Sequence, residues 1–110
     1  MLFRETILYR KAVALSVDVH TITKSLPRGH SPIADQLKRA STSIVLNFAE
    51  GYSRATKKER RRFFDIARGS TFEVAAGLDV LQAIGAIDVD TWQAATDKAE
   101  QLSRMLWAFK

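Results

Sequence analysis

The stretch that decides the fold is Asn47–Phe63, NFAEGYSRATKKERRRF. It contains the end of one helical pattern, a short connector, and the beginning of a longer helical pattern. Thr56 followed by Glu59 has the spacing of a capping box, in which the threonine hydroxyl accepts a hydrogen bond from the third amide of a helix. The stretch therefore predicts two consecutive helices joined by a tight connector.

Apolar residues spaced by three and four extend on both sides of this stretch, as expected for helices that each bury one face. Pro27 and Pro32 enclose a loop, and Ser31 before Pro32 predicts the start of a helix. Gly85 predicts a helix end, and Asp88 or Asp90 predicts the next start. The expected helices cover about residues 4–25, 32–52, 57–84 and 90–109, and the third has the buried seam Phe63, Ala67, Ser70, Val74, Gly77, Leu81 and Ile84.

The length of 110 residues and the absence of any persistent two-residue alternation favour a single all-helical domain over residues 1–110. Four helices with short connectors predict an all-α, up-down-up-down antiparallel four-helix bundle. The chain has no cysteine and no apolar run of membrane-spanning length, and its start does not have the pattern of a signal peptide. A cytoplasmic protein without membrane association is expected.

Positive charge is concentrated in the middle of the chain. From Arg54 to Arg68 there are seven basic and two acidic residues, which leaves +5, equal to the formal net charge of the whole chain. With Phe63 facing the core, we expect Lys57, Lys58, Arg61 and Arg68 on the outer half of the helix. This basic belt predicts contact with RNA or DNA phosphates, and an acidic protein is the alternative partner. Its members are Arg54, Lys57, Lys58, Arg60, Arg61, Arg62 and Arg68.

A polar set near the expected core has two interpretations, and its members are Asn47, Glu50, Ser70 and Glu73. A buried hydrogen-bond network that fixes helix register is favoured over a catalytic or metal-binding pair formed by Glu50 and Glu73, because the Glu-x-x-His pairs of bundle metal sites are missing. His20 and His30 have no second ligand at helical spacing. We expect no catalytic residue, no metal and no cofactor, and hence no enzymatic activity.

Self-association is predicted from apolar residues that point away from the expected core seams. The first helix carries an additional stripe spaced by four, and aromatic residues on the third and fourth helices behave similarly. The predicted oligomer interface comprises Tyr9, Val13, Val17, Phe72 and Trp107.

The stretch Ser41–Arg54, STSIVLNFAEGYSR, resembles the S-I-x-x-N-I-A-E-G motif of the 23S ribosomal RNA intervening-sequence proteins, also called S23 or bacterial four-helix bundle proteins. Lys57–Glu59 and Phe63–Glu73 are similar to the segment that follows this motif, and Leu81–Ile87 is similar to a conserved helix end of the family. The resemblance covers about residues 8–106. Phe48 replaces the usual isoleucine, and the loop between Pro27 and Pro32 is shorter than is usual.

This resemblance implies a small, basic, all-helical protein that assembles into a ring-like homopentamer. One branch of the family comprises accessory proteins of diversity-generating retroelements, which work with a reverse transcriptase and bind nucleic acid. Other members are encoded within intervening sequences of ribosomal RNA genes and have no settled activity. The resemblance therefore implies the copies of this chain as partners, RNA or DNA as ligand, and a reverse transcriptase as a further candidate partner.

Overall fold

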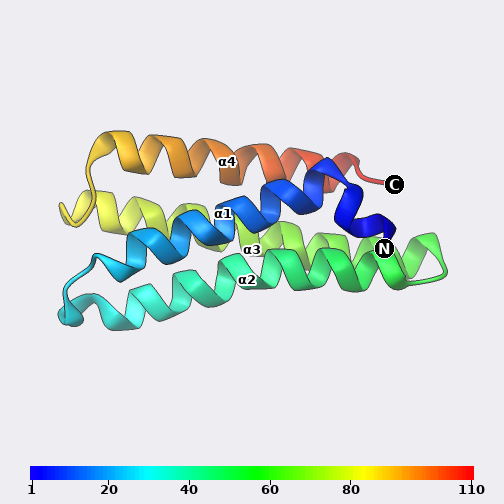
Figure 1. Ribbon diagram of the computed structural model, residues 1–110, viewed down its shortest axis with the longest axis horizontal. Coiled ribbons are helices and arrows are strands. Elements are labelled where there is room, and N and C mark those ends of the chain that lie inside the picture. The colour runs from blue at the N-terminus through cyan, green and yellow to red at the C-terminus, as the bar shows by residue number, and fades with distance from the viewer.

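Four α-helices form almost the whole chain in the computed structural model, which describes residues 1–110. They are α1 (Ile7–Lys24), α2 (Ser31–Ser53), α3 (Lys57–Ala83) and α4 (Val89–Ala108), with the short 3-10 turns η1 (Leu2–Glu5) and η2 (Arg28–His30). Consecutive helices run in alternate directions, and both termini lie at the end that holds the α2–α3 connector (Figure 1). The predicted all-α class with four helices is confirmed.

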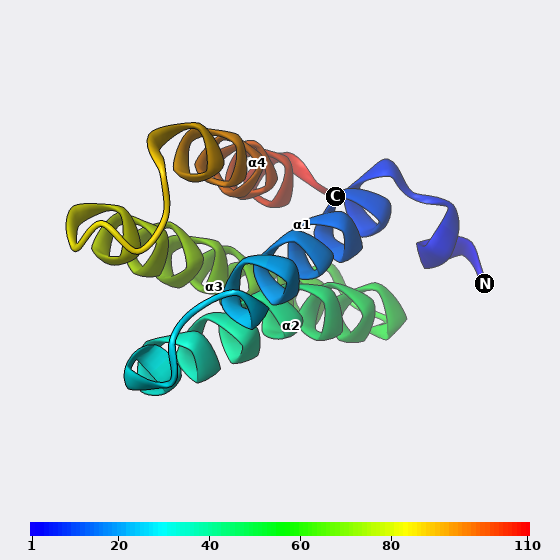
Figure 2. The same ribbon diagram turned by 60° about the vertical axis from the view of Figure 1, so that its left-hand side comes forward.

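The helices form a ring of neighbours around one core. α2 contacts α1 and α3, and α4 contacts α3 and α1, so that every helix has two partners (Figure 2). The longest dimension is 44 Å, about twice the other two. None of the four helices has an apolar stretch long enough to cross a membrane.

Three helices begin at side-chain caps. Thr6 accepts from the Tyr9 amide at 3.1 Å, so α1 begins at Ile7 instead of residue 4 and η1 is a separate turn. Thr56 accepts from the Glu59 amide at 3.2 Å, as its motif predicts. The Glu59 carboxylate accepts from the Thr56 hydroxyl.

Of the two aspartates considered for the start of α4, Asp88 is the cap and accepts from the Thr91 amide at 2.7 Å. Hydrogen bonds from Thr91, above all from its backbone amide, lower the pKa of Asp88 below its ordinary value. Gly85 ends the preceding helix with a φ of 74°, as predicted. The predicted helix start at Ser31 is confirmed, but Ser31 is the first residue of α2 and not its cap, because η2 leads directly into the helix.

The predicted seam of α3 is confirmed at Ala67, Ser70, Val74 and Leu81, which are buried, but it was wrong at its two ends. Phe64, which is 1% exposed, faces the core where Phe63 was expected, and Ile84 is 54% exposed. The Phe64 ring stacks on Phe48 with 5.4 Å between centroids, and Phe109 meets the edges of both rings at 5.3 and 5.1 Å. These contacts between distant residues determine which of two adjacent phenylalanines is buried, because either one fits the three-four spacing.

Two glycines allow close approach between α2 and α3. A Cβ on Gly77 would lie 2.6 Å from Leu37 Cδ2 and 2.9 Å from Leu37 Cγ. A Cβ on Gly51 would lie 2.7 Å from the Phe64 ring. The absence of side chains at both positions therefore lets α2 and α3 pack closely around core residues.

Arg61 of α3 closes the end of α4. Its Nη2 donates to the Leu106 carbonyl at 2.6 Å, and its Nη1 donates to the carbonyls of Trp107 and Phe109, both at 3.2 Å. Its Nε also pairs with Asp65 at 3.0 Å. The last carbonyls of a helix have no partner within the helix, and a cation there is favourable to the helix dipole. Arg61 therefore joins the start of α3 to the end of α4.

We predict opposite effects for alanine at two glycines of α3. A Cβ added at Gly69 would have no atom of a neighbouring residue within 4 Å. Gly69→Ala should therefore raise the free energy of unfolding by ~0.5–1 kcal/mol, because alanine has the higher helix propensity. Gly77→Ala should lower it by about 1 kcal/mol, because overpacking against the buried Leu37 exceeds the propensity gain. Urea unfolding followed by circular dichroism measures both. A Gly77→Ala protein at least as stable as the parent contradicts the close packing.

We predict that Arg61→Lys lowers the free energy of unfolding by about 1–2 kcal/mol, because an ammonium cannot reach three carbonyls as the planar guanidinium does. The same loss should accelerate amide hydrogen exchange in the last turn of α4. Arg62→Lys is the matched control, since Arg62 is exposed and forms no hydrogen bond or ion pair, and its effect should stay below about 0.5 kcal/mol. Equal effects of the two substitutions would remove the capping role of Arg61.

Candidate nucleic-acid interface

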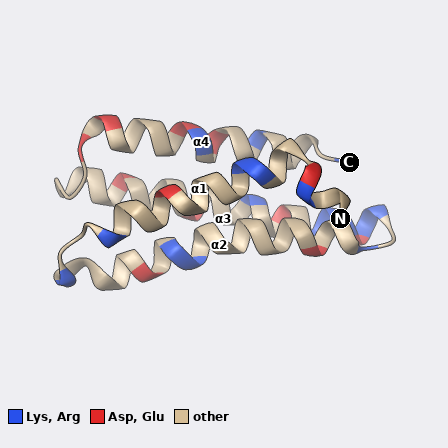
Figure 3. Ribbon diagram, in the orientation of Figure 1, with Lys and Arg blue, Asp and Glu red and all other residues tan.

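The basic segment lies at one end of the bundle. Figure 3 shows Lys and Arg gathered on the α2–α3 connector and the first turns of α3, close to both termini. Two residues determine where the basic segment lies. Thr56 caps the start of α3, and Gly51 leaves room for the Phe64 ring to approach α2. The segment is therefore attached to a well-packed aromatic core.

The observed rotation of α3 changes the predicted placement of the cations. Lys57, Lys58 and Arg62 are exposed, whereas Arg60, Arg61 and Arg68 are half-buried beside the core. Arg61 and Arg68, which were expected on the outer half of the helix, instead face α4. The seven cations therefore lie at one end of the bundle without forming the uniform outer belt that was predicted.

Acidic partners neutralise only two of the seven cations. Arg54 pairs with Glu50 at 3.4 Å, and Arg61 pairs with Asp65 at 3.0 Å. The other five have no carboxylate within 4 Å, and these are Lys57, Lys58, Arg60, Arg62 and Arg68. Because like charges are close together there, this end carries a positive potential that attracts polyanions.

Several arginines are stacked on aromatic rings. Arg60 lies 5.0 Å from the Tyr52 ring, and Arg54 lies 4.9 Å from the Phe63 ring, which Arg62 also approaches. Stacking keeps the positive charge while it holds the guanidinium in place. Arg60 and Arg62 are therefore held in place without being neutralised, whereas Arg54 is also paired with Glu50.

Arg68 lies close to two exposed rings. Its guanidinium carbon is 5.2 Å from the Phe72 ring and 5.1 Å from the Trp107 ring. The Nε atoms of Arg68 and Arg60 are shielded from solvent and have no hydrogen-bond partner within the protein. Arg68 thus connects aromatic residues of α3 and α4 next to the basic segment.

A cavity of about 740 Å³ opens where α3 begins and α4 ends, and we refer to it as the end cavity. Its cationic lining includes Lys57, Lys58, Arg60 and Arg61. Its aromatic lining is Phe64, Trp107 and Phe109. Positive groups and rings therefore share one concave surface that suits an aromatic anion.

The predicted polar network is present in part. Asn47 donates to the Ser43 carbonyl at 3.0 Å and to the Ser43 hydroxyl at 2.9 Å, and Ser70 of α3 donates to the same hydroxyl at 2.9 Å. Ser43, which was not predicted, therefore links Asn47 and Ser70 across the α2–α3 contact. Its signal in the sequence was its position four residues before Asn47, on the same face of the helix.

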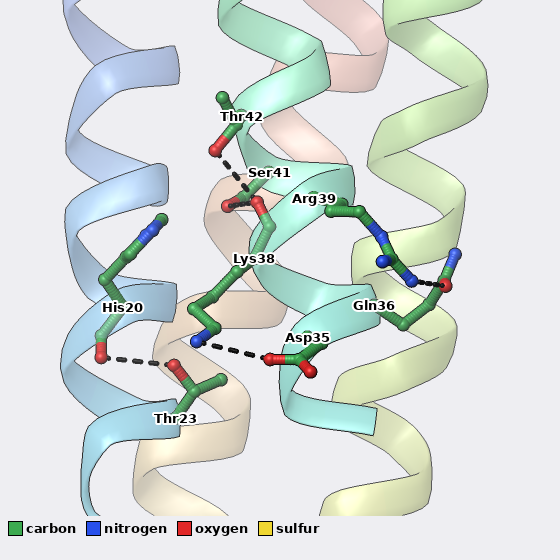
Figure 4. Close-up of polar contacts among 8 residues, drawn as sticks. All are labelled: His20, Thr23, Asp35, Gln36, Lys38, Arg39, Ser41 and Thr42. Carbon is green, nitrogen blue, oxygen red and sulfur yellow. Dashed lines mark hydrogen bonds and ion pairs between the residues drawn. The ribbon is translucent and has the colours of Figure 1, made fainter. Parts of the chain in front are cut away.

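Glu50 and Glu73 lie outside this network, contrary to the prediction. Both are exposed. Glu50 pairs with Arg54, and Glu73 accepts from Gln36 at 3.1 Å. Figure 4 shows Gln36 also accepting from Arg39, so Glu73 belongs to a polar chain on the surface of α2 and α3. The two carboxylates have separate partners and do not form a pair.

The predicted interface residues occupy two surfaces. Val13 and Val17 line a groove of about 450 Å³ between α1 and α2, and Val17 is 58% exposed. Tyr9, which was expected to be exposed, is half-buried because the Phe3 ring of η1 covers it at 5.0 Å. Phe72 and Trp107 lie on the α3–α4 side, which the order of the helices places opposite the α1–α2 groove.

The two histidines are separated as expected. His20 Nδ1 lies 2.8 Å from the Ser16 carbonyl on α1, and His30 ends the turn η2. The stacked arginines were missed, although Arg60 four residues before Phe64 and Arg68 four residues before Phe72 have the spacing of helical neighbours. Tyr52, Trp107 and Phe109 join the site only through tertiary packing.

Comparison with known proteins supports the fold and the family. The family model for the 23S rRNA-intervening sequence protein matches residues 4–108. Among curated proteins, none matches the chain. A protein of unknown function from the S23 ribosomal protein family of Bacteroides thetaiotaomicron has a similar solved structure, with a TM-score of 0.85 and 18% identity over 91% of this chain and 94% of that one. Because the family model spans nearly all 110 residues, the chain belongs to the 23S rRNA-intervening sequence protein family.

Proposed function

We propose that the protein is a non-enzymatic nucleic-acid-binding protein that contacts RNA or DNA phosphates through the basic end of the bundle. The observation that carries the proposal is the cluster of five cations without an acidic partner, namely Lys57, Lys58, Arg60, Arg62 and Arg68. Such a cluster binds phosphates without reading base sequence, and the counterions that it releases make binding sensitive to salt.

The interior supports a binding function over catalysis. Every buried polar residue carries a hydroxyl group, and no charged residue is buried. Catalytic acids and bases usually depend on buried or closely paired titratable groups to shift their pKa values. The surface cations are therefore the better basis for a function than the separated carboxylates of Glu50 and Glu73.

An acidic protein is the second candidate partner. The exposed rings of Phe72 and Trp107 beside Arg68 have the composition that is enriched in protein interfaces. We favour nucleic acid over an acidic protein as the partner, because the positive charge is concentrated on a short segment. Binding of phosphates to such a segment does not require a second surface of complementary shape. The reverse transcriptase remains a predicted partner that rests on the family resemblance alone.

We also propose self-association through the α1–α2 groove, as a ring-like homopentamer. The family resemblance supports the assembly, and the exposed Val17 beside Val13 in a groove supports the surface. A ring needs two different complementary surfaces on every subunit, and the α1–α2 groove would be one of them.

We predict that Lys57→Gln/Lys58→Gln weakens binding to a single-stranded RNA of mixed sequence. The plot of log affinity against log salt should become shallower by about 1.4, since each phosphate contact contributes ~0.7 for a single strand. Fluorescence anisotropy at several salt concentrations gives both quantities. The matched control is Arg10→Gln/Lys24→Gln, which removes the same charge from exposed positions on α1 and should leave the slope unchanged.

Two results would contradict the proposal. Equal losses in both double variants would show that only net charge matters, which removes the basic end as the binding site. Failure of the parent protein to bind RNA or DNA at low salt would instead favour the acidic protein partner.

We predict that Val17→Asp disrupts the assembly and leaves the bundle folded, because a charge would be placed on an exposed apolar position. Five copies of the 12.3 kDa chain give a particle of about 62 kDa, which light scattering after size exclusion would detect. Val80→Asp on α3 is the matched control, since Val80 is 48% exposed, and it should keep the parent mass. A mass that falls only in Val80→Asp moves the interface to α3.

A further inference from the structure

We propose that the end cavity and the adjoining Trp107 and Phe72 rings form a track for single-stranded nucleic acid, with bases stacked on the rings and phosphates on the cations. This inference rests on the proposed function and specifies the form of nucleic acid that the basic end prefers. It requires free cations, accessible rings and a continuous path between them, and each of these is present.

The cations of the end cavity are available to phosphates. Lys57, Lys58 and Arg60 line the cavity and form no hydrogen bond or ion pair within the protein. Arg61 lines it as well, but its guanidinium is occupied by the carbonyls of α4 and by Asp65. Lys110 also lines the cavity and is unpaired, so the cavity offers four unpaired cations to a phosphate backbone.

The rings are accessible to bases. Trp107 lines the end cavity and is 68% exposed, and Phe72 is 58% exposed. Exposed aromatic faces beside a positive groove are how proteins bind single strands, because every base can stack on a ring whatever its identity. In a duplex the bases already stack on and pair with one another, so only the phosphates could contact this surface.

Arg68 makes the path continuous. Its guanidinium lies about 5 Å from both rings, at 5.2 Å from Phe72 and 5.1 Å from Trp107, and it has no hydrogen bond or ion pair. A phosphate between two stacked bases would therefore meet a cation held between the rings. From Lys57 to Phe72 the track extends about 22 Å along α3, at the helical rise of ~1.5 Å per residue.

Acidic residues define where the track ends. Beyond Phe72 the groove between α3 and α4 is lined by Asp79 and Glu100, with Arg104 as the only cation. Two carboxylates repel a phosphate backbone, so the strand should leave the surface near Phe72. The charge along this groove thus changes from positive at the end cavity to negative at its middle.

The test compares an RNA strand of mixed sequence, about 12 nucleotides long, with the duplex that it forms with its complement. The single strand should bind about tenfold more tightly than the duplex, and Trp107→Leu should lower single-strand affinity about tenfold while duplex affinity stays unchanged. In a Trp92→Phe background, single-strand binding should also quench Trp107 fluorescence. Trp92→Phe is the matched control, because it removes the other tryptophan at the far end of α4 and should bind like the parent.

The particle mass of the Trp107→Leu protein is measured by light scattering alongside its nucleic-acid affinity. Equal binding of strand and duplex, with no effect of Trp107→Leu, overturns the inference and leaves phosphate binding intact. A lower particle mass in Trp107→Leu also overturns it, because Trp107 would then belong to a subunit interface. Absence of binding to both nucleic acids, by contrast, removes the proposed function itself.

Discussion

The stacking of Phe64 on Phe48 is the contact on which the rest of the structure depends. It fixes the rotation of α3 about its own axis, and Gly51 makes it possible by leaving room for the Phe64 ring. With Phe64 inside, residues three and four positions before it lie next to the core at the end of the bundle. Arg61 therefore reaches the last carbonyls of α4, and Arg60 covers the Tyr52 ring. A rotation that buried Phe63 instead would turn Arg61 away from the end of α4.

The number of helices, their approximate bounds and most of their caps could be predicted from the sequence, because these depend on local signals. Thr56, Asp88 and Gly85 act within a few residues of themselves. Which of Phe63 and Phe64 is buried could not be predicted, since both fit the spacing and only contacts with Phe48 and Phe109 distinguish them. Placing Phe63 instead of Phe64 in the core moved Arg61 and Arg68 to the wrong side of the helix. The positions of Glu50 and Glu73 were missed for a related reason: a polar residue near a seam turns outward when a surface partner is available, as Arg54 and Gln36 are.

The basic segment has two kinds of residue that composition alone does not separate. The planar guanidinium of Arg61 donates to three carbonyls at the end of α4, a geometry that the ammonium group of lysine does not have. Lys57 and Lys58 are exposed, are not paired with carboxylates, and contribute mainly repulsion to the folded state. Basic residues in the first turn of a helix also oppose the helix dipole. These two lysines therefore have no structural role comparable to that of Arg61, and this supports the proposed phosphate contact.

Arginine stacking offers a physical reason why structure and binding can share one end of the bundle. A carboxylate partner would fix an arginine but cancel its charge, whereas an aromatic ring fixes it and leaves the charge in place. Three arginines of the segment approach rings without contacting a carboxylate: Arg60, Arg62 and Arg68. Arg54 also approaches a ring, and it pairs with the exposed Glu50. Because their side chains are already restrained, less rotamer entropy is lost when a phosphate binds than for free lysines. The aromatic residues that order the core at Phe48, Phe64 and Phe109 thus continue into the rings that hold the surface charge, and the same packing that stabilises this end restrains its cations.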